Sequence, residues 1–366
     1  MDASRRSFLV GGLALPALAA AEPVFSYKVL GKTGLKVTSV GFGCMITSDG
    51  SVVERAADLG ITYFDTARNY QGGNNERMVG AALKKKRKNV VLSTKTEARN
   101  KEEALQQIDT SLKELGTDFV DIWYLHGRTR PEDISDDLVE AQQIAKAAGK
   151  IRFAGVSTHS GQHELIPFLA RHPKIDVILT QYNFTMQPFM NEVIDQAAAA
   201  GKGVVAMKVM AGGFRRGNAD ERLKRDGAML AALKWVVRNP HVHTTVPSMT
   251  DMDQLDENLK AMSQPFGAAD EKILALQMDH ITPLYCRMCG QCDGHCRQGL
   301  PVPDVLRFLA YAEGYGQFAL GRERFMGLGD PHTSVRCSDC RGCTVKCPYG
   351  VKVPERMARA QELFTC

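Results

Sequence analysis

The sequence lacks a strong excess of charge of either sign. Its 366 residues carry 46 Lys and Arg against 41 Asp and Glu, a formal net charge of +5. Such a balance gives no reason to expect nucleic acid or a charged membrane surface as the partner. The run from Lys84 to Lys88 is dense in cations. We interpret it as the solvated end of a helix rather than as a nuclear signal or an anion-binding patch.

Long apolar runs are also scarce. The N-terminal stretch Gly11 to Leu18 is much shorter than the roughly 20 residues of a membrane helix, so no stable span is expected in the mature chain. It follows Arg5-Arg6-Ser7-Phe8-Leu9 and precedes small residues around Ala19. This arrangement resembles a twin-arginine export signal, which we place at residues 1–21. The resemblance implies export of a folded protein, with the periplasm as the expected location.

A dinucleotide-binding doubly wound sheet lacks its fingerprint here, because Gly41-Phe42-Gly43-Cys44-Met45 has no third glycine. From Val29 to about Ala261, short β-branched runs alternate with segments of helical periodicity. Eight strand–helix units over this length match a (β/α)8 barrel of about 250 residues. We therefore predict an α/β fold, a (β/α)8 TIM barrel over residues 22–281. The expected strands are Ser39–Gly43, Ile61–Asp65, Val90–Thr94, Phe119–Leu125, Phe153–Ser157, Val177–Gln181, Val204–Lys208 and Thr244–Ser248, and the clearest helices are Lys101–Leu115, Asp136–Ala147 and Asn191–Ala200.

Two short alternating runs between Tyr27 and Val37 flank a Gly-rich turn ahead of the first barrel strand. This pattern predicts a β-hairpin, which could plug the N-terminal end of the barrel. After the barrel we expect one helix, Ala268–Met278. The composition changes at Thr282-Pro283, where cysteines begin, and we place a domain boundary there.

Eight of the ten cysteines fall in two groups with the spacing C-x2-C-x2-C-x3-C. The groups and the Gly, Val and Pro residues after them repeat at an interval of 51 residues. This spacing is typical of 4Fe–4S ferredoxins, where the fourth cysteine often binds the other cluster. Zinc is the alternative, but it more often pairs two C-x2-C units. The cysteines are Cys286, Cys289, Cys292 and Cys296, then Cys337, Cys340, Cys343 and Cys347.

We therefore predict two 4Fe–4S clusters, with Cys347 completing the first and Cys296 the second. Helices expected at Asp304–Ala312 and Glu355–Phe364 follow the two motifs. Residues 282–366 thus resemble a small, mainly α-helical ferredoxin-like domain. Outside the two groups, Cys44 is expected in the core or at the site, and Cys366 as an exposed thiol.

Polar residues end three of the predicted barrel strands, where barrel enzymes carry their chemistry. Asp65, Lys95 and His126 end successive strands, and Tyr70 lies in the loop after Asp65. One such residue is usually structural, whereas four on one rim indicate a catalytic site. His159, His241 and His243 follow no pattern that assigns them a role.

These residues carry a resemblance to the aldo-keto reductases. The segments Phe64–Tyr70, Asn75-Glu76, Ser93–Lys95, Leu125-His126 and Gly155–Ser157 are similar to that family's signature, over about residues 27–261. Members with a two-cluster ferredoxin tail form a recognisable subgroup. The resemblance implies an oxidoreductase that reduces a carbonyl or oxidises an alcohol with NAD or NADP.

The implied catalytic roles agree with simple acid–base chemistry. Tyr70 would donate a proton to the developing alkoxide, and the Lys95 ammonium would lower its pKa from about 10 toward neutrality. Asp65 would hold Lys95, and His126 would orient the carbonyl and could share the proton transfer.

The resemblance also implies cofactor contacts at the ends of the later strands. Ser157 and Gln181 would hold the carboxamide, Met207 would stand where many members stack a tyrosine, and Lys208 could cradle the pyrophosphate. Gln254 stands where the family often has an arginine for the phosphate of NADP. The substitution favours NAD, although Arg215 and Arg216 could replace the arginine. The remaining expected contacts are Ser248, Glu257 and Asn258; core packing is the alternative for Met207, and an exposed helix for Glu257 and Asn258.

Three functional hypotheses remain open from the sequence. The barrel could turn over a small carbonyl or alcohol while the clusters exchange electrons with a partner protein, or the clusters could be structural. In the third, the protein is an electron-transfer module on a non-catalytic barrel. A nicotinamide transfers electrons in pairs and a cluster singly, and no flavin signature bridges the two.

Overall fold

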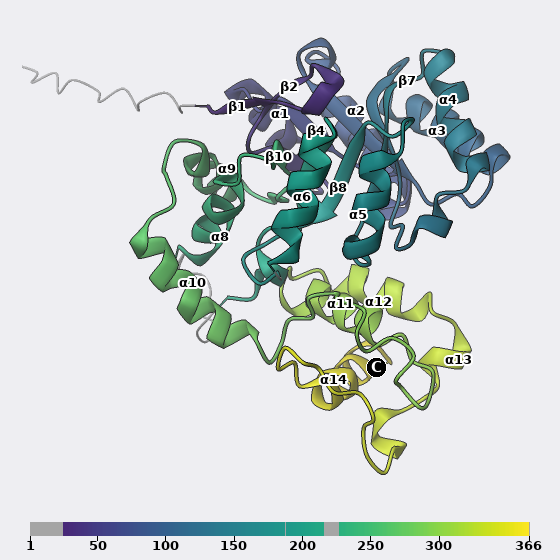
Figure 1. Ribbon diagram of the computed structural model, residues 1–366, viewed down its shortest axis with the longest axis vertical. Helices are drawn as coiled ribbons and strands as arrows, with labels where there is room; N and C mark the ends of the chain where they lie inside the picture. Colours follow the sequence, from purple (N-terminus) through teal and green to yellow (C-terminus); the bar gives the residue numbers. More distant parts are fainter. Residues whose placement is uncertain (1–24, 187, 216–226, 366) are drawn as a thin grey trace, which may run out of the picture.

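The computed structural model describes residues 25–186, 188–215 and 227–365. The expected export signal, Arg216 and Cys366 lie outside the described residues. Eight parallel strands form one sheet in the order β3 to β10. A parallel bridge between Gly43 and Ser248 joins its two edges, so the sheet closes on itself. The predicted (β/α)8 barrel is confirmed, and Figure 1 shows its helices around the strands.

The barrel elements lie close to their predicted positions. The helices Lys101–Leu115 (α3) and Asp136–Ala147 (α4) have the predicted bounds. Strand β10 is shorter than predicted because Pro247 cannot donate a ladder hydrogen bond. The strands are Phe42–Gly43 (β3), Tyr63–Asp65 (β4), Val91–Thr96 (β5), Val120–Leu125 (β6), Ile151–Thr158 (β7), Val177–Gln181 (β8), Gly203–Met207 (β9) and Thr244–Thr245 (β10); the other barrel helices are Gly50–Leu59 (α1), Asn74–Leu83 (α2), Gln162–Arg171 (α5), Phe189–Ala199 (α6), Ala228–Val237 (α8) and Met252–Leu259 (α9).

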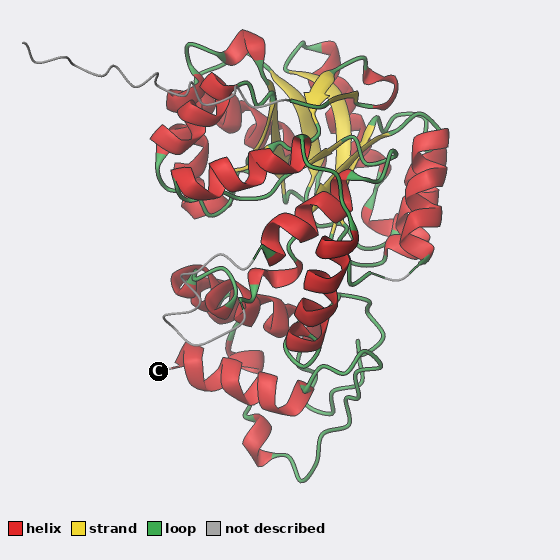
Figure 2. Ribbon diagram, turned by 90° about the vertical axis from the view of Figure 1, so that its left-hand side faces the viewer, coloured by secondary structure: helices red, strands yellow, loops and turns green. Residues whose placement is uncertain are grey.

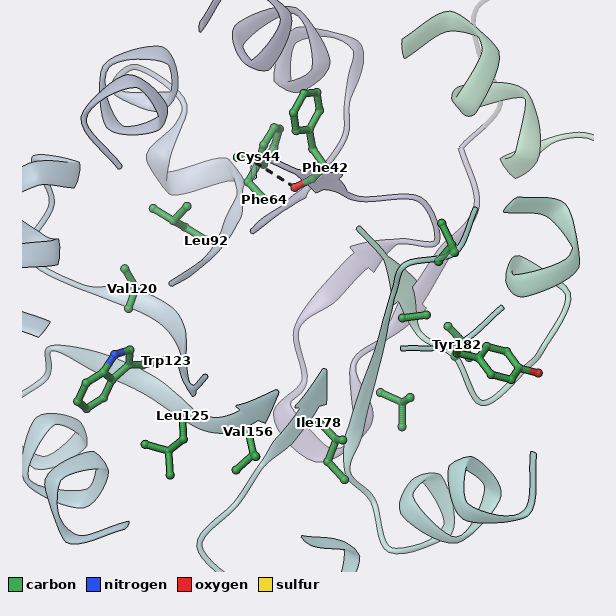
Figure 3. Close-up of a cluster of buried hydrophobic side chains, with 14 of the residues drawn as sticks. Phe42, Cys44, Phe64, Leu92, Val120, Trp123, Leu125, Val156, Ile178 and Tyr182 are labelled. Carbon is green, nitrogen blue, oxygen red and sulfur yellow. Dashed lines mark hydrogen bonds between the residues drawn. The ribbon is translucent and has the colours of Figure 1, made fainter. Parts of the chain in front are cut away.

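The main core lies between the sheet and the surrounding helices. Alternate strand residues such as Phe64, Trp123 and Ile178 point outward into it and are fully buried, as Figure 3 shows. Cys44 belongs to the same cluster, with its thiol near the Phe42 carbonyl. Burial raises the pKa of that thiol far above its usual value. Cys44 is therefore a core residue, the first of its two predicted roles.

The predicted hairpin forms from Tyr27–Val29 (β1) and Lys36–Thr38 (β2), which pair antiparallel. Leu30, Leu35 and Val37 are buried against side chains inside the barrel. A Cβ on Gly31 would stand 2.5 Å from the backbone of Gly203, the first residue of β9. The hairpin thus plugs the N-terminal end of the barrel and leaves the opposite end for the site.

After α10 (Ala268–Ile281), the chain forms a second set of helices with a core of its own. They lie beyond the barrel in Figures 1 and 2. The contact is close, since a Cβ on Gly314 would stand 1.9 Å from the Gly212 carbonyl oxygen of the barrel. The helices are Val302–Glu313 (α11), Phe318–Met326 (α12), Asp330–Thr333 (α13) and Val353–Thr365 (α14). Among the described residues, no helix is long and apolar enough to cross a membrane.

Candidate active site

The structure brings the four predicted catalytic residues together at the C-terminal ends of β4, β5 and β6. The Lys95 ammonium donates to Asp65 Oδ2 at 2.5 Å and to the Thr66 carbonyl at 2.7 Å. It also lies 4.9 Å from the centre of the Tyr70 ring. The rings of Tyr70 and His126 meet edge to face, with centroids 5.9 Å apart. All four side chains thus border one small volume.

A buried chain of hydroxyl groups fixes Asp65 from inside the barrel. Ser93 Oγ donates to Asp65 Oδ1 at 2.7 Å, and Tyr63 donates to Ser93 at 3.2 Å. The hydroxyls of Tyr63 and Tyr124 are 2.7 Å apart. Since Asp65 accepts from both Ser93 and Lys95, its carboxylate has one orientation, and it holds the ammonium beneath Tyr70.

The loop that carries Tyr70 is held by the rest of the signature. Asn75 accepts a hydrogen bond from Thr66 at 2.6 Å and donates to the Cys44 carbonyl at 2.8 Å. Glu76 is fully buried and accepts from Thr94 Oγ1 at 2.6 Å. Asn75 and Glu76 therefore anchor the start of α2 to β5 and to the residues that follow β3 and β4, and so position Tyr70 at the rim.

The predicted net fall of the Tyr70 pKa toward neutrality is wrong. Burial, followed by the Asp65 carboxylate, raises the pKa of Tyr70 well above its usual value. The Lys95 ammonium is directed at Asp65 and Thr66 and lies over the face of the ring. For Lys95, by contrast, burial lowers the pKa of the ammonium. Tyr70 is thus a neutral phenol at neutral pH, the form that can donate a proton.

His126 is also neutral. Burial lowers its pKa well below the usual value, and the nearby cations Lys95, Arg324 and Arg307 lower it further. A neutral imidazole can donate one hydrogen bond to a carbonyl oxygen without carrying charge into the site.

These residues open into a cavity of about 1740 Å³ at the C-terminal end of the barrel. This volume exceeds the roughly 300–1,000 Å³ of common ligand pockets, so it can admit two ligands together. Lys95 lies beneath its floor and is 1% exposed. The predicted site residues on its wall are Asp65, Tyr70, His126, Met207, Lys208, Ser248 and Gln254.

The four other expected cofactor contacts do not line this cavity. Ser157 Oγ accepts from the Gly127 N–H at 2.9 Å. Gln181 donates to the hydroxyl of Tyr285, a residue beyond the barrel, at 3.0 Å. Glu257 and Asn258 are buried on α9, so the alternative of an exposed helix is wrong. Met207 lies both in the barrel core and on the cavity wall, so it fits both predictions.

Further cavity residues come from outside the signature. Arg307 and Tyr311 lie on α11, Arg324 lies on α12, and all three line the cavity. Lys208, whose φ of 56° is unusual for a lysine, places its ammonium 4.7 Å from the centre of the Tyr311 ring. The i, i+4 spacing of Arg307 and Tyr311 indicates a shared helix face. Nothing in the sequence shows that this face covers the barrel.

The last cysteine of the second group lies beside the first group. Cys286, Cys289 and Cys292 line one small cavity with Cys347 of the second group. At the other group, Thr344 Oγ1 donates to the His295 carbonyl at 2.6 Å, which ties the loop of Cys343 to that of Cys296. All nine described cysteines are free thiols. Within the described residues, no group of three or more His, Cys, Asp or Glu is arranged to hold a metal ion.

The comparison with protein families agrees with this geometry. The model described as "Aldo/keto reductase family" matches residues 48–228, which include all four catalytic candidates and the loop after β9. Over these residues the chain is similar to the aldo/keto reductase family. Its members include reductases and dehydrogenases, and the chain is accordingly an oxidoreductase.

Several members of the family resemble the chain over most of their length. The uncharacterized oxidoreductase YqkF of Bacillus subtilis is 26% identical, over 70% of this chain and 97% of the relative. The L-galactose dehydrogenase of Arabidopsis thaliana is 27% identical, over 65% and 88% respectively. The aldo-keto reductase AKR11C1 of Bacillus halodurans (holo form) superposes with a TM-score of 0.60, at 26% identity over 69% of this chain and 96% of that structure.

Proposed function

We propose that the barrel reduces a small carbonyl compound, or oxidises the corresponding alcohol, with a nicotinamide cofactor. The observation that carries this proposal is the buried Asp65–Lys95 pair beneath the neutral Tyr70 phenol at the wall of a large cavity. The name of the Arabidopsis relative supports a sugar or sugar-like alcohol as one substrate class.

Each residue has a distinct task in this proposal. Tyr70 donates its hydroxyl proton to the oxygen of the carbonyl as negative charge develops there. His126 donates a hydrogen bond to the same oxygen and orients it. Asp65 and Ser93 hold the Lys95 ammonium close to Tyr70, where its charge favours the tyrosinate left after proton transfer.

The nicotinamide supplies the hydride, which no protein side chain can donate. The cavity residues that fit it are Met207, Lys208, Ser248 and Gln254. We propose NAD rather than NADP, because Gln254 is neutral and its amide donates to Thr250 and Asp251 at 2.9 and 2.7 Å. The Gln181 amide does not fit its expected role, because it already donates to Tyr285.

We further propose that the cysteines bind two 4Fe–4S clusters, which transfer single electrons when bound. Cys286, Cys289, Cys292 and Cys347 hold one, and Cys296, Cys337, Cys340 and Cys343 hold the other. The small cavity shared by the first four supports this exchange. An arrangement unsuited to a single ion is compatible with a cluster, which spreads its four thiolates over four irons.

The remaining proposals concern the organisation and location of the chain. We propose a signal at residues 1–21, a barrel at 22–281 and a ferredoxin-like domain at 282–366. Export by the twin-arginine route to the periplasm requires that the clusters and the nicotinamide bind before translocation. The paired arginines Arg5 and Arg6 support that route.

The substitution Tyr70→Phe tests the proposed chemistry. It removes the proton donor and keeps the ring, so we expect aldehyde reduction to fall by about 10²- to 10⁴-fold. The matched control is Tyr27→Phe, because Tyr27 is 42% exposed on the hairpin. Equal turnover by Tyr70→Phe and Tyr27→Phe would contradict the proposal.

A further inference from the structure

The helices beyond the barrel bring positive charge to the catalytic residues. Arg307 and Arg324 line the same cavity as Tyr70 and His126. Both lower the pKa of His126, after burial and Lys95. Arg324 also lowers the pKa of Tyr70, against the larger effects of burial and Asp65. Their guanidinium groups therefore lie on the substrate side of the site, close to where the carbonyl is reduced.

Several buried nitrogen atoms at this place have no hydrogen-bond partner among the described residues. They are Arg307 Nε, Arg128 Nε, His126 Nδ1 and His159 Nδ1, and all four side chains line the cavity. Buried polar atoms are nearly always paired in native proteins. Four donor-capable nitrogens around one cavity indicate a ligand that supplies acceptors.

The local carboxylates do not cancel this charge. Glu97 lies 4.0 Å from Arg324 and 3.6 Å from His126, and is half exposed. Asp304 binds one end of Arg307 at 2.7 Å, on the preceding turn of its own helix. Asp65 is already neutralised by Lys95. Cations outnumber carboxylates on the cavity wall by seven to five. The basic residues are Arg99, Arg128, Lys208, Arg215, Arg307, Arg324 and Arg359, and the acidic ones are Asp65, Glu97, Asp133, Glu313 and Glu323.

We propose that Arg307 and Arg324, with His159 beside them, form a subsite for an anionic group of the substrate, a carboxylate or a phosphate. The inference rests on the proposed function for the position of the carbonyl, and it narrows the substrate to an acidic aldehyde, ketone or alcohol. Guanidinium groups bind such anions through paired, charge-assisted hydrogen bonds. The subsite exists only because α11 and α12 cover the barrel, so these helices determine specificity.

Two aldehydes of nearly equal shape test this subsite in the purified full-length protein. They are para-carboxybenzaldehyde and para-carbamoylbenzaldehyde, which differ in charge but share the reacting group. The variants are Arg307→Gln and Arg324→Gln. Arg322→Gln is the matched control, because Arg322 lies on α12 but is exposed and does not line the cavity.

We expect the wild-type protein to prefer the carboxylate in kcat/KM by about tenfold or more, the range of a charged hydrogen bond. Each cavity variant should remove most of that preference, because kcat/KM for the carboxylate falls by a larger factor than kcat/KM for the carboxamide. Arg322→Gln should leave both values unchanged. Equal losses for both aldehydes would overturn the proposal.

Binding separates this inference from the proposed reaction and from the cofactor's phosphates. Calorimetry with the alcohols para-(hydroxymethyl)benzoate and para-(hydroxymethyl)benzamide should show the same preference without turnover. If the protein binds the benzoate more tightly than the benzamide but reduces neither aldehyde, the proposed function is contradicted and the subsite is supported. Equal binding of the two alcohols would overturn the subsite. A loss of NADH or NADPH affinity in the variants, with the substrate preference intact, would assign the arginines to the cofactor and overturn it too.

Discussion

The Tyr70 hydroxyl shows what a sequence can and cannot say about a single residue. The positions of Asp65, Tyr70, Lys95 and His126 could be predicted, because strand ends meet on one rim of a barrel. The direction of the Tyr70 pKa could not. It depends on burial by the folded chain and on the nearby Asp65 carboxylate, which both raise it. His159 and Arg307 were missed for a similar reason. They become candidates for the site only because the fold places both on the wall of one cavity.

The pKa shifts predict a broad pH plateau for carbonyl reduction. The raised pKa of Tyr70 keeps its proton in place above the usual value of about 10, and the lowered pKa of His126 keeps it neutral above about 6.5. A profile of kcat/KM against pH should therefore be flat between about 6.5 and 10, and fall at higher pH as Tyr70 ionises. A fall near neutrality would show that Lys95 lowers the pKa of Tyr70 after all.

At the scale of elements, regular periodicity was sufficient for α3, α4 and β8, whose bounds match the prediction. The helices α12 and α13 were not predicted. Gly321 lies inside α12 and lowers the helix propensity of this segment. That glycine is needed because its Cβ would stand 2.7 Å from the Phe308 carbonyl oxygen of α11. Packing between helices, rather than local preference, determines this element.

Gly314 marks the contact between α11 and the loop after β9. The substitution Gly314→Ala would place a Cβ 1.9 Å from the Gly212 carbonyl oxygen, although its φ of −90° suits alanine. We expect a loss of about 1–3 kcal/mol in the free energy of unfolding, measured by denaturant titration. Gly267→Ala is the control, since nothing lies within 4 Å of its Cβ. Equal stability of the two variants would show that this contact is looser than described.

At the scale of the whole molecule, the ferredoxin-type spacing of the cysteines predicted their exchange, and the positions of Cys286 and Cys347 agree with it. The sequence could not show that the helices between the motifs reach the barrel mouth, because docking depends on surfaces far apart in the chain. The helices α11 and α12 place the Tyr311 ring beside the Lys208 ammonium, and they bring two arginines close to the catalytic residues. The two parts of the chain therefore build one cavity.

The exchange of cysteines predicts an unusual pattern of iron loss. Cys347→Ser should remove about four of about eight irons, and so should Cys296→Ser. Adding Cys286→Ser to Cys347→Ser should remove no more, whereas adding Cys337→Ser should remove the rest. Iron and sulfide analysis of anaerobically purified protein measures this directly. If Cys347→Ser with Cys286→Ser removes all the iron, and Cys347→Ser with Cys337→Ser removes only half, each motif binds its own cluster. Absence of iron from the wild-type protein and all variants would contradict the clusters themselves.

The central claim is that this barrel is a nicotinamide-dependent carbonyl reductase, and its most direct test is the fate of the cofactor. The protein is purified without oxygen, NADH or NADPH is added, and the bound nicotinamide is assayed before and after an aldehyde is supplied. We predict that reduced nicotinamide binds and is consumed in proportion to the alcohol formed. Failure to bind either cofactor, or binding without consumption by any aldehyde, would contradict the claim.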